Sequence, residues 1–324
     1  MMRVKYGRLF LLKILSAIVH VRYARYQKKH RYYIRDNAFS RLYQAKYFFR
    51  DFIKKRKYKT IEFCGEFQQE LCFVLPFAYW HHLNGTLQET ISTRNTKELY
   101  FFSENHSEVY DKRVWEYNGQ HFEIPNMTHT LKLNRSKWTP VPLKKHYSND
   151  LFRFDKPILV IANKYNIEWN EQPLNFIDLP TLQKIIDACG GKYQIIYNRP
   201  SSDVIVSDNS DILDLHDRQW LQQYYPDVIL MEDLYARHRH EANNFNHFQL
   251  MVYASCEHFI SVHGGTAALA SYFGGTNIIL SKNGIEHIFD EFQTIFPALS
   301  GANILHARSH EELITHVCER FVKG

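Results

Sequence analysis

The chain has 324 residues, of which 45% are hydrophobic and 23% charged, a composition typical of folded globular proteins. Intrinsic disorder, collagen and coiled coil are therefore excluded, and at roughly 150 residues per domain the length predicts two domains. The five cysteines are an odd number without a closely spaced pair, which argues against a disulfide framework and a thiolate zinc site. We therefore expect a reducing, cytoplasmic environment.

The formal net charge of +6 is unevenly distributed along the chain. Residues 1–60 contain 18 Lys and Arg against two acidic residues, a net charge of +16, and they end in the basic cluster KKRKYK at 54–59. Residues 61–324 contain 22 Lys and Arg against 32 Asp and Glu, a net charge of −10. A concentrated basic segment favours polyanionic partners, here an anionic membrane surface or a nucleic acid.

Residues 8–22 predict a helix that is apolar around most of its circumference, with Lys13, Ser16 and His20 as the main interruptions. The apolar stretch is shorter than the roughly 20 residues of a bilayer span. The bases and tyrosines of residues 20–31 argue against a signal-peptide cleavage site. We therefore expect a cytoplasmic protein without a transmembrane helix.

The basic amphipathic segment 1–59 favours peripheral attachment to an anionic membrane, because apolar insertion and basic residues both contribute to binding. Two alternatives stay open. The helix can instead pack on the protein's own core, with the bases as a solvated face, or the segment can bind nucleic acid. No recognisable nucleic-acid-binding motif accompanies the bases, so a nucleic-acid partner is the less expected of these.

The first half of the remaining chain predicts a smaller α/β domain at 60–150. A short strand at 60–64 leads through a glycine turn into an apolar helix, and a second strand is predicted at 98–103. The polar, proline-punctuated stretch 125–155 predicts irregular structure and a linker.

The second half, 151–324, predicts a Rossmann-like domain. Helices are expected from about Asp178, Phe245 and Thr266, and a final helix begins with the capping box of Ser309 and Glu312. Strands alternating with helices imply a mostly parallel, doubly wound sheet covered on both faces. The predicted strands are 157–162, 193–197, 228–231, 258–262 and 276–280.

Open α/β sheets bind ligands at the carboxyl ends of their strands, so the residues that directly follow each strand are the candidates for a site. The glycine turn of SVHGGTAALASYFGG lets backbone N–H groups approach a diphosphate closely, and Arg199 and Lys164 can add charge to such a site. The alternatives are a purely structural turn and solvated loop charges. The predicted ligand-binding residues are Lys164, Arg199, Glu232, His263, Gly264, Gly265, Thr266 and Lys282.

The stretch YASCEHFISVHGGTAALASYFGGTNIIL resembles the donor-binding half of GT-B glycosyltransferases, and the likeness covers roughly residues 156–324. The resemblance implies two Rossmann-like domains that face each other across a cleft, an N-terminal one for the acceptor and a C-terminal one for a nucleotide-sugar. It implies donor contact by His263 to Thr266 and by basic residues on facing loops, usually without an essential metal. The chain lacks the HxRRGD-like stretch of fucosyltransferases and the acidic-small-Gly turn of heptosyltransferases, so the resemblance assigns no sugar.

Glu66 in GEFQQE is the leading candidate for the general base, because it follows the first predicted strand on the side of the expected cleft. His106 and Glu104, which follow the predicted strand 98–103, are the alternatives. Glu66 can instead serve only to stabilise the start of the next helix through its charge.

The predicted function is a metal-independent glycosyltransferase, a hexosyl- or pentosyltransferase, that moves a sugar from a nucleotide-diphosphate-sugar co-substrate to a glycan or lipid-linked glycan acceptor, in the synthesis of a cell-surface polysaccharide or glycoconjugate. No cofactor is expected. A metal at His81 and His82 is not expected either, since adjacent helix residues point apart. Two alternatives stay open: a polysaccharide pyruvyl transferase-like enzyme that uses phosphoenolpyruvate, and a nucleic-acid-binding protein that uses the Tyr/Arg-rich N-terminus.

Overall fold

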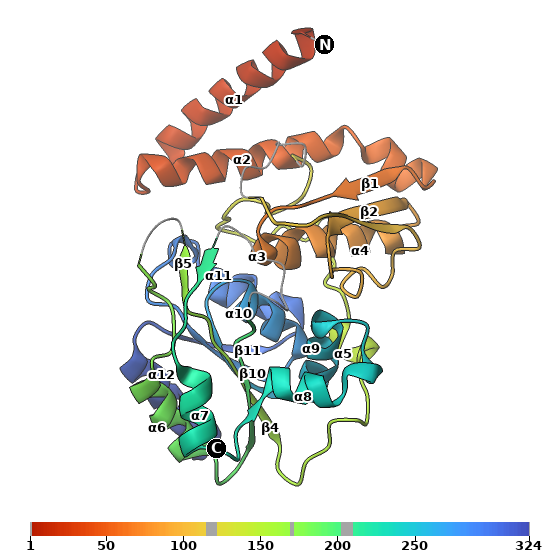
Figure 1. Ribbon diagram of the computed structural model, residues 1–324. Coiled ribbons are helices and arrows are strands. Elements are labelled where there is room, and N and C mark those ends of the chain that lie inside the picture. Colours follow the sequence, from red (N-terminus) through yellow and green to blue (C-terminus); the bar gives the residue numbers. More distant parts are fainter. Residues whose placement is uncertain (1, 115–121, 169–171, 202–209, 324) are drawn as a thin grey trace.

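The computed structural model describes residues 2–114, 122–168, 172–201 and 210–323 (Figure 1). Within them the fold is mixed α/β, with a six-stranded parallel sheet, a three-stranded parallel sheet and a two-stranded antiparallel ladder. The α/β class is therefore confirmed. The arrangement of two Rossmann-like domains facing across a cleft stays a prediction.

The six-stranded sheet has the strand order of a Rossmann-like fold. In spatial order its strands are β11 (Asn303–Ala307), β10 (Thr276–Leu280), β9 (His258–Val262), β4 (Ile158–Ala162), β6 (Gln194–Asn198) and β8 (Ile229–Leu230). Along the chain, the first three strands run from β4 outward to β8, and the last three run from β9 outward to β11 on the other side. The order therefore reverses between β4 and β9, which makes the carboxyl ends of these two strands the topological switch point where such sheets bind ligands.

Helices connect these strands, and two of the predicted N-termini are confirmed by their capping hydrogen bonds. The Asp178 side chain accepts a hydrogen bond from the backbone of Thr181, and the Ser309 side chain accepts one from the backbone of Glu312. A separate ladder pairs β5 (Asn166–Glu168) with β7 (Ser210–Ile212). The helices are α6 (Leu179–Cys189), α7 (Asp217–Tyr224), α8 (Met231–Arg237), η3 (Arg239–Glu241), α9 (Phe245–Ala254), α10 (Gly265–Ala270), η4 (Ser271–Phe273), η5 (Ile285–His287), α11 (Glu291–Thr294), η6 (Pro297–Leu299), α12 (His310–Val317) and η7 (Cys318–Val322).

The three-stranded sheet is built from β1 (Lys59–Glu62), β2 (Leu87–Thr93) and β3 (His106–Tyr110), in that order. A continuous helical segment joins β1 to β2. It consists of α3 (Phe67–Gln69), the π-helical turn η2 (Glu70–Val74) and α4 (Leu75–Leu83), and its middle residues are buried. A short helix, α5 (Leu143–His146), is the one helix in the described part of the stretch 125–155 that was expected to be irregular.

The predicted strand at 98–103 is wrong. Backbone hydrogen bonds from Leu99 to Thr96, from Tyr100 to Lys97 and from Ser103 to Tyr100 fold this segment into consecutive turns. Leu99, Tyr100 and Phe102 are nevertheless buried, and Phe101 is partly buried. An apolar run of this length indicates that side chains are buried, but it does not distinguish a strand from a series of turns, which explains the error.

One apolar cluster extends through both parallel sheets. It includes Phe63 and Leu71 from the first half, and Val160, Phe259 and Phe273 from the second. A second cluster lies on the other face of the six-stranded sheet. The helical segment after β1 therefore packs against the second half, and the Tyr272 hydroxyl donates a hydrogen bond to the Leu71 carbonyl across this contact at 2.7 Å.

The N-terminal segment forms two long helices, α1 (Met2–Arg22) and α2 (Lys28–Ala45), followed by the π-helical turn η1 (Phe49–Lys54). Arg31 fastens the connection by donating to the carbonyls of Ala24 and Tyr26 at 2.7 and 2.8 Å. Among the described side chains of α1, only Val19 is buried. Along the described residues, no helix has both the length and the apolarity to cross a membrane.

Candidate functional site

The carboxyl ends of β4 and β9 place Lys164 against the glycine turn that follows β9. Gly264 has a φ of +114°, a conformation that residues with a side chain rarely adopt. A Cβ atom on Gly264 would lie 3.3 Å from Lys164 Nζ, so the ammonium group lies directly beside the turn. Lys164, His263 and Gly264 of the predicted set thus lie together at the switch point.

The N-terminus of α3 packs onto the same turn. A Cβ atom on Gly265 would lie 2.5 Å from the ring of Phe67, so this ring covers the turn closely. Glu66 is the N-cap residue of α3, where its side chain makes no capping hydrogen bond to the described backbone of that helix. The segment that carries the predicted base therefore packs on the predicted donor turn, about 200 residues away in sequence. We call this meeting point of α3, Lys164 and the turn 263–265 the junction.

Arg113 anchors the loop that carries Glu66. Its Nη1 donates to the Gly65 carbonyl at 2.9 Å, and its Nη2 donates to Glu70 Oε2 at 2.6 Å. The guanidinium also lies over the ring of Phe67, 4.8 Å from the ring centre. Because Arg113 and Glu70 are buried, each neutralises the other, and the backbone on both sides of Glu66 is held in place.

A buried carboxylate orients His263 at the junction. Glu286 Oε1 lies 3.1 Å from His263 Nε2 and accepts a hydrogen bond from Gln68 Nε2 at 3.1 Å, while Ser281 Oγ lies 3.1 Å from His263 Nδ1. Burial tends to raise the pKa of Glu286, but the charge and hydrogen bond of His263 outweigh it and lower that pKa far below its ordinary value. Glu286 is therefore ionised. It holds Nε2 of the His263 ring in place, and Ser281 lies against Nδ1 of the same ring.

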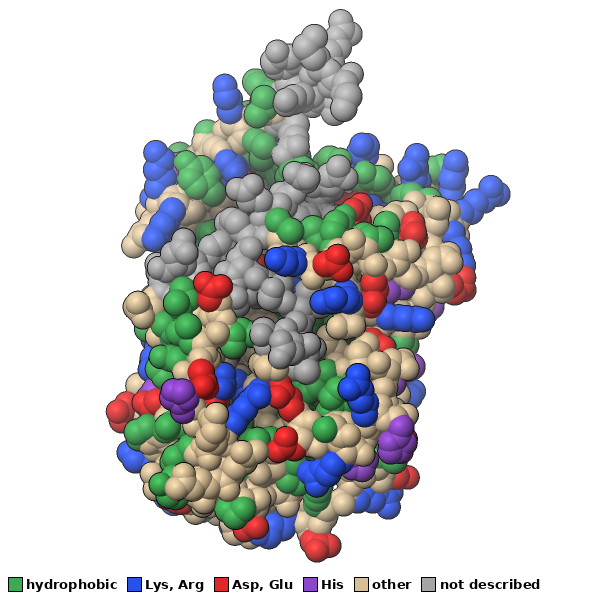
Figure 2. Space-filling model, in the orientation of Figure 1, with side chains coloured by type: hydrophobic (Ala, Val, Ile, Leu, Met, Phe, Trp, Pro, Cys, Tyr) green, Lys and Arg blue, Asp and Glu red, His purple; other side chains and the backbone are tan. Residues whose placement is uncertain are grey.

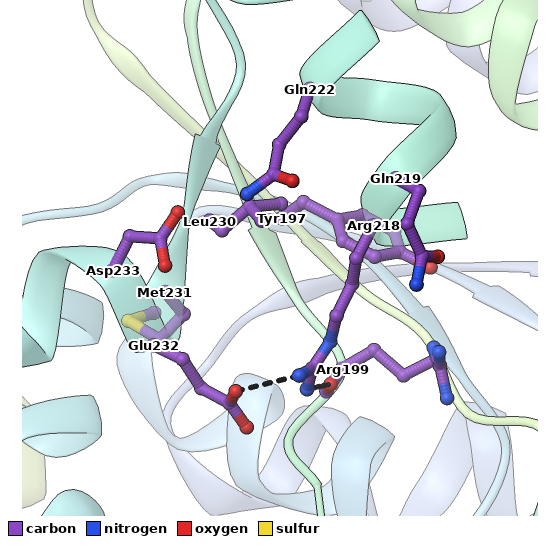
Figure 3. Close-up of a pocket in the computed structure, with 9 residues that line it drawn as sticks. All are labelled: Tyr197, Arg199, Arg218, Gln219, Gln222, Leu230, Met231, Glu232 and Asp233. Carbon is purple, nitrogen blue, oxygen red and sulfur yellow. Dashed lines mark hydrogen bonds and ion pairs between the residues drawn. The ribbon is translucent and has the colours of Figure 1, made fainter. Parts of the chain in front are cut away.

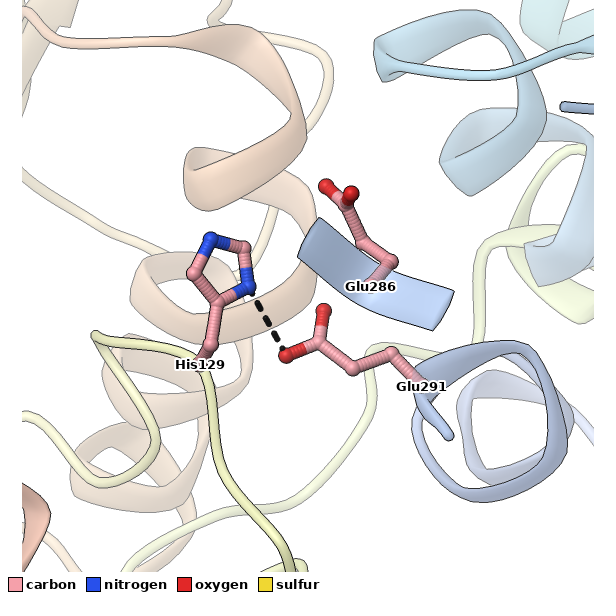
Figure 4. A group of neighbouring side chains, drawn as sticks. All are labelled: His129, Glu286 and Glu291. Carbon is pink, nitrogen blue, oxygen red and sulfur yellow. Dashed lines mark hydrogen bonds and ion pairs between the residues drawn. The ribbon is translucent and has the colours of Figure 1, made fainter. Parts of the chain in front are cut away.

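A second histidine–carboxylate pair lies beside the first (Figure 4). His129 Nδ1 lies 3.0 Å from Oε1 of Glu291, a carboxylate that is almost fully buried. Burial tends to lower the pKa of His129. The hydrogen bond and charge of Glu291, together with the charges of Glu286 and Glu66, outweigh this effect and raise the pKa.

Helix α2 positions His129. Asn37 Nδ2 donates to the carbonyls of Thr128 and His129 at 3.0 and 2.8 Å. The ring of Tyr33 packs edge-on against the imidazole, with ring centres 5.0 Å apart. The N-terminal segment therefore forms part of the molecular surface and also holds one residue of the candidate site, His129, in place.

His129, Glu286 and Glu291 each offer one ligand atom, and these atoms lie within 4.8 Å of one another. Imidazole and carboxylate ligands suit a divalent transition metal such as Mn²⁺ or Zn²⁺. Each group nevertheless already has a partner: His129 pairs with Glu291, and Glu286 pairs with His263 and Gln68. These contacts compensate both buried carboxylates, so the geometry supports two hydrogen-bonded histidine–carboxylate pairs without requiring a metal.

The sequence reasoning missed His129, Glu286 and Glu291. His129 and Glu291, which pair with each other, lie 162 positions apart, and no local motif links them. The rule that ligands bind beyond the strand ends, extended a few residues past β10, would have included Glu286. No comparable signal marks His129, which lies in an irregular loop.

Arg199 and Glu232 lie at a separate pocket of about 220 Å³ beside the carboxyl ends of β6 and β8 (Figure 3). Two nitrogens of Arg199 donate to the buried carboxylate of Asp217 at 2.5 Å. Glu232 pairs with Arg218 at 2.8 Å and accepts from the backbone of Ser201 at 2.6 Å. Both predicted residues are therefore engaged within the protein, and neither lies at the junction. The pocket is lined by Tyr197, Arg199, Arg218, Gln219, Gln222, Leu230, Met231, Glu232 and Asp233.

Two further residues of the predicted donor-binding set, Thr266 and Lys282, lie beside the junction or are directed away from it. Thr266 lies in the first turn of α10, next to Gly265, and is partly buried. Lys282 follows β10, and its ammonium group lies over the ring of Phe176, 5.4 Å from the ring centre. Lys282 is thus directed to a neighbouring loop through a cation–π contact.

His106 and Glu104 lie elsewhere in the first half. His106 begins β3, at the amino end of the sheet, where its ring nitrogens lie 2.8 Å from Thr90 Oγ1 and 3.3 Å from Thr96 Oγ1. Burial lowers its pKa. Glu104 is exposed and paired with Lys57. Both residues were chosen for following a strand at 98–103, and that strand does not exist.

We compared the chain with protein-family models, with curated proteins and with solved structures, and no match was found.

Proposed function

We propose that this protein is a glycosyltransferase that moves a sugar, a hexose or pentose, from a nucleotide-diphosphate-sugar to a glycan or lipid-linked glycan acceptor. The observation that supports the proposal best is the contact between α3 and the glycine turn after β9. It unites a candidate base, Glu66, with a cation at the switch point, Lys164. Transfer to a hydroxyl group needs both, one to accept a proton and one to stabilise a departing diphosphate.

In the proposed reaction, the acceptor hydroxyl donates its proton to the Glu66 carboxylate while its oxygen attacks the anomeric carbon. The bond from that carbon to the diphosphate oxygen breaks, and the bonding electrons leave with the diphosphate. Lys164 and the protonated form of His129 would stabilise the negative charge that develops. Because these cations belong to the protein, we propose that the reaction needs no metal ion or other cofactor.

The pocket beside β6 and β8 suits the nucleoside part of such a donor. β6 is the direct neighbour of β4, and adjacent strands lie about 4.8 Å apart, so the pocket begins one strand from the switch point. Amide and carboxylate side chains at its rim, from Gln219, Gln222 and Asp233, offer hydrogen bonds to a base or a ribose. In this proposal, residues 151–324 bind the donor and residues 60–150 present the acceptor, as in a GT-B arrangement.

We further propose that the protein is cytoplasmic and attaches peripherally to an anionic membrane through α1. Phe10, Ile14, Ile18 and Val21 recur on one side of this helix and are 41% to 82% exposed. They are accompanied by the basic residues of the N-terminal segment. A helix of this kind binds in the plane of the interface, with apolar side chains inserted and bases near the headgroups.

A thermal-shift panel of nucleoside diphosphates, nucleotide-sugars and phosphoenolpyruvate tests the proposal. A true donor at about 100 times its dissociation constant should stabilise the fold by about 2.7 kcal/mol. Stabilisation by phosphoenolpyruvate alone would replace the proposal by a pyruvyl transferase-like activity. The panel is run with a chelator and then with Mn²⁺. Stabilisation that needs Mn²⁺, and that Glu291→Gln abolishes, would overturn the metal-free mechanism.

A further inference from the structure

The C-terminal part of α2 and the segment between α2 and β1 expose a group of large apolar side chains. Four of them lie at positions 48, 49, 52 and 53, in or next to η1, at spacings that put them on one side of this π-helical turn. Such side chains are ordinarily buried, and their clustering on a surface marks an interaction site. Leu42, Phe48, Phe49, Phe52 and Ile53 are each 40% to 62% exposed.

The same segment carries positive charge without exposed negative charge. Its one acidic residue, Asp51, is fully buried and bound by Lys137 and Tyr58. Among the described residues, only Lys57 of the exposed bases forms an ion pair, with Glu104. Figure 2 shows Lys and Arg side chains gathered along the edge of the molecule at this end of α2. The exposed bases are Arg41, Lys46, Arg50, Lys54, Lys55, Arg56 and Lys57.

We infer that residues 41–57 form a second membrane-binding surface, which we call the η1 surface, and that it binds an anionic bilayer independently of α1. Phenylalanine and isoleucine side chains would insert at the level of the headgroups, and the surrounding bases would contact acidic lipids. Leu42 and Ile53 are aliphatic and offer no ring to a nucleobase, whereas all five apolar side chains can insert into a bilayer, which favours a bilayer over single-stranded nucleic acid. A symmetric dimer through this surface would bring like charges together.

The η1 surface and α1 lie at the same end of the molecule, at opposite ends of α2 (Figure 1). The side chain of Asn37, on α2, holds the loop of His129. A bilayer bound to both surfaces would thus lie against the helix that supports the junction. If the proposed glycosyl transfer holds, this placement favours a lipid-linked acceptor over a soluble glycan.

The test measures binding of the full chain to vesicles of phosphatidylcholine with about 30% phosphatidylserine. The triple variant Phe48→Ser, Phe49→Ser, Ile53→Ser keeps α1 intact and changes only exposed positions. We expect its partition coefficient to fall about tenfold or more, because three inserting side chains are lost. The matched control, Val109→Ser, Leu151→Ser, Leu174→Ser, removes side chains of comparable exposure, 45% to 58%, from other surfaces. It should bind within about twofold of the parent.

Parental vesicle binding by the η1 triple variant would overturn the inference. So would two other results: loss of binding to single-stranded RNA with vesicle binding unchanged, or loss of a concentration-dependent dimer in sedimentation velocity without any vesicle effect. Nucleotide-sugar binding, measured in solution without vesicles, should be unchanged in the variant. If the parent bound no nucleotide-sugar, the proposed function would fail, and the vesicle result would still decide the η1 surface.

Discussion

Glu66 and Lys164 carry two of the charges that the proposed transfer uses directly. Glu66 lies at the N-terminus of α3 and Lys164 beside Gly264. Arg113 holds the backbone on both sides of Glu66 by contacting Gly65 and Phe67. At the scale of single residues, the site therefore contains partly buried charges, and the buried Arg113–Glu70 ion pair holds the backbone beside one of them, Glu66, in place.

Replacing Glu66 by glutamine should lower transfer on the order of 10²-fold or more, because an amide keeps the size of the side chain but cannot accept the acceptor's proton. Donor binding, measured by calorimetry, should be preserved. Glu104→Gln serves as the control, since Glu104 is exposed and lies on another surface. Near-parental turnover in Glu66→Gln would leave Glu66 with only a structural role at the start of α3.

The His129–Glu291 pair predicts a pH dependence of stability. The folded-state pKa of His129 lies above its ordinary value of 6.5. Protonated His129 therefore contributes its full stabilisation of the fold at pH values below its ordinary pKa of 6.5. This contribution is lost as the pH rises through the raised pKa of the folded state. Glu291→Gln should cost about 1.5–3 kcal/mol at about pH 6, as for a hydrogen bond to a charged group, and less at about pH 8.5.

Denaturant unfolding of parent and Glu291→Gln across this pH range measures the difference. Glu311→Gln, at a fully exposed position, should show no such trend in its difference from the parent. If the difference between parent and Glu291→Gln stayed constant with pH, His129 would not be the titrating partner.

At the scale of elements, the contact between α3 and α10 decides whether a site exists. The ring of Phe67 occupies the space that a side chain on Gly265 would need. The glycine is thus required for helix packing as well as for any approach of a ligand to the backbone.

Gly265→Ala should therefore destabilise the fold by about 1–3 kcal/mol through overpacking against Phe67, and should weaken donor binding too. The double variant Phe67→Leu, Gly265→Ala should recover part of this loss, since a smaller side chain makes room for the new methyl group. A double-mutant cycle from urea unfolding gives the coupling energy. Additive effects would show that the ring and the glycine do not share this space.

At the scale of the whole molecule, charge and apolar surface are segregated. The first 60 residues carry +16 and the remainder −10, and 11 of the 18 large apolar side chains that are exposed among the described residues lie in the basic part. Such segregation separates a candidate membrane-facing end from the sheets that hold the junction (Figure 1).

Replacing Phe10, Ile14 and Ile18 by serine should weaken binding to anionic vesicles about tenfold or more, with the η1 surface providing the binding that remains. The melting temperature should stay near that of the parent, because these side chains are exposed. Salt should weaken the remaining binding as the Debye length falls from about 10 Å at 0.1 M to about 3 Å at 1 M. Co-sedimentation measures both effects. A large drop in melting temperature would instead indicate that α1 belongs to the protein's core.

The sequence by itself determined the elements whose signal is local. Buried strands β4, β9 and β10 were predicted from apolar runs, and the starts of α6 and α12 from capping residues. The strand order, with its switch point beside Lys164 and Gly264, agrees with the doubly wound sheet expected from alternating strands and helices. The segment 98–103 shows the limit of this reasoning, because apolar side chains can be buried by a turn as well as by a strand.

Only the tertiary structure decided which loops meet and which charges pair. Arg199 follows β6 as predicted, yet its guanidinium donates to Asp217 within the protein. His129 pairs with Glu291, which lies 162 positions further along the chain. Periodicity and composition report which side of an element is buried, whereas the partner of a charge depends on packing between distant elements. A sequence can therefore place a glycine turn at a strand end, but the helix that covers it and the carboxylates that surround it follow from the fold.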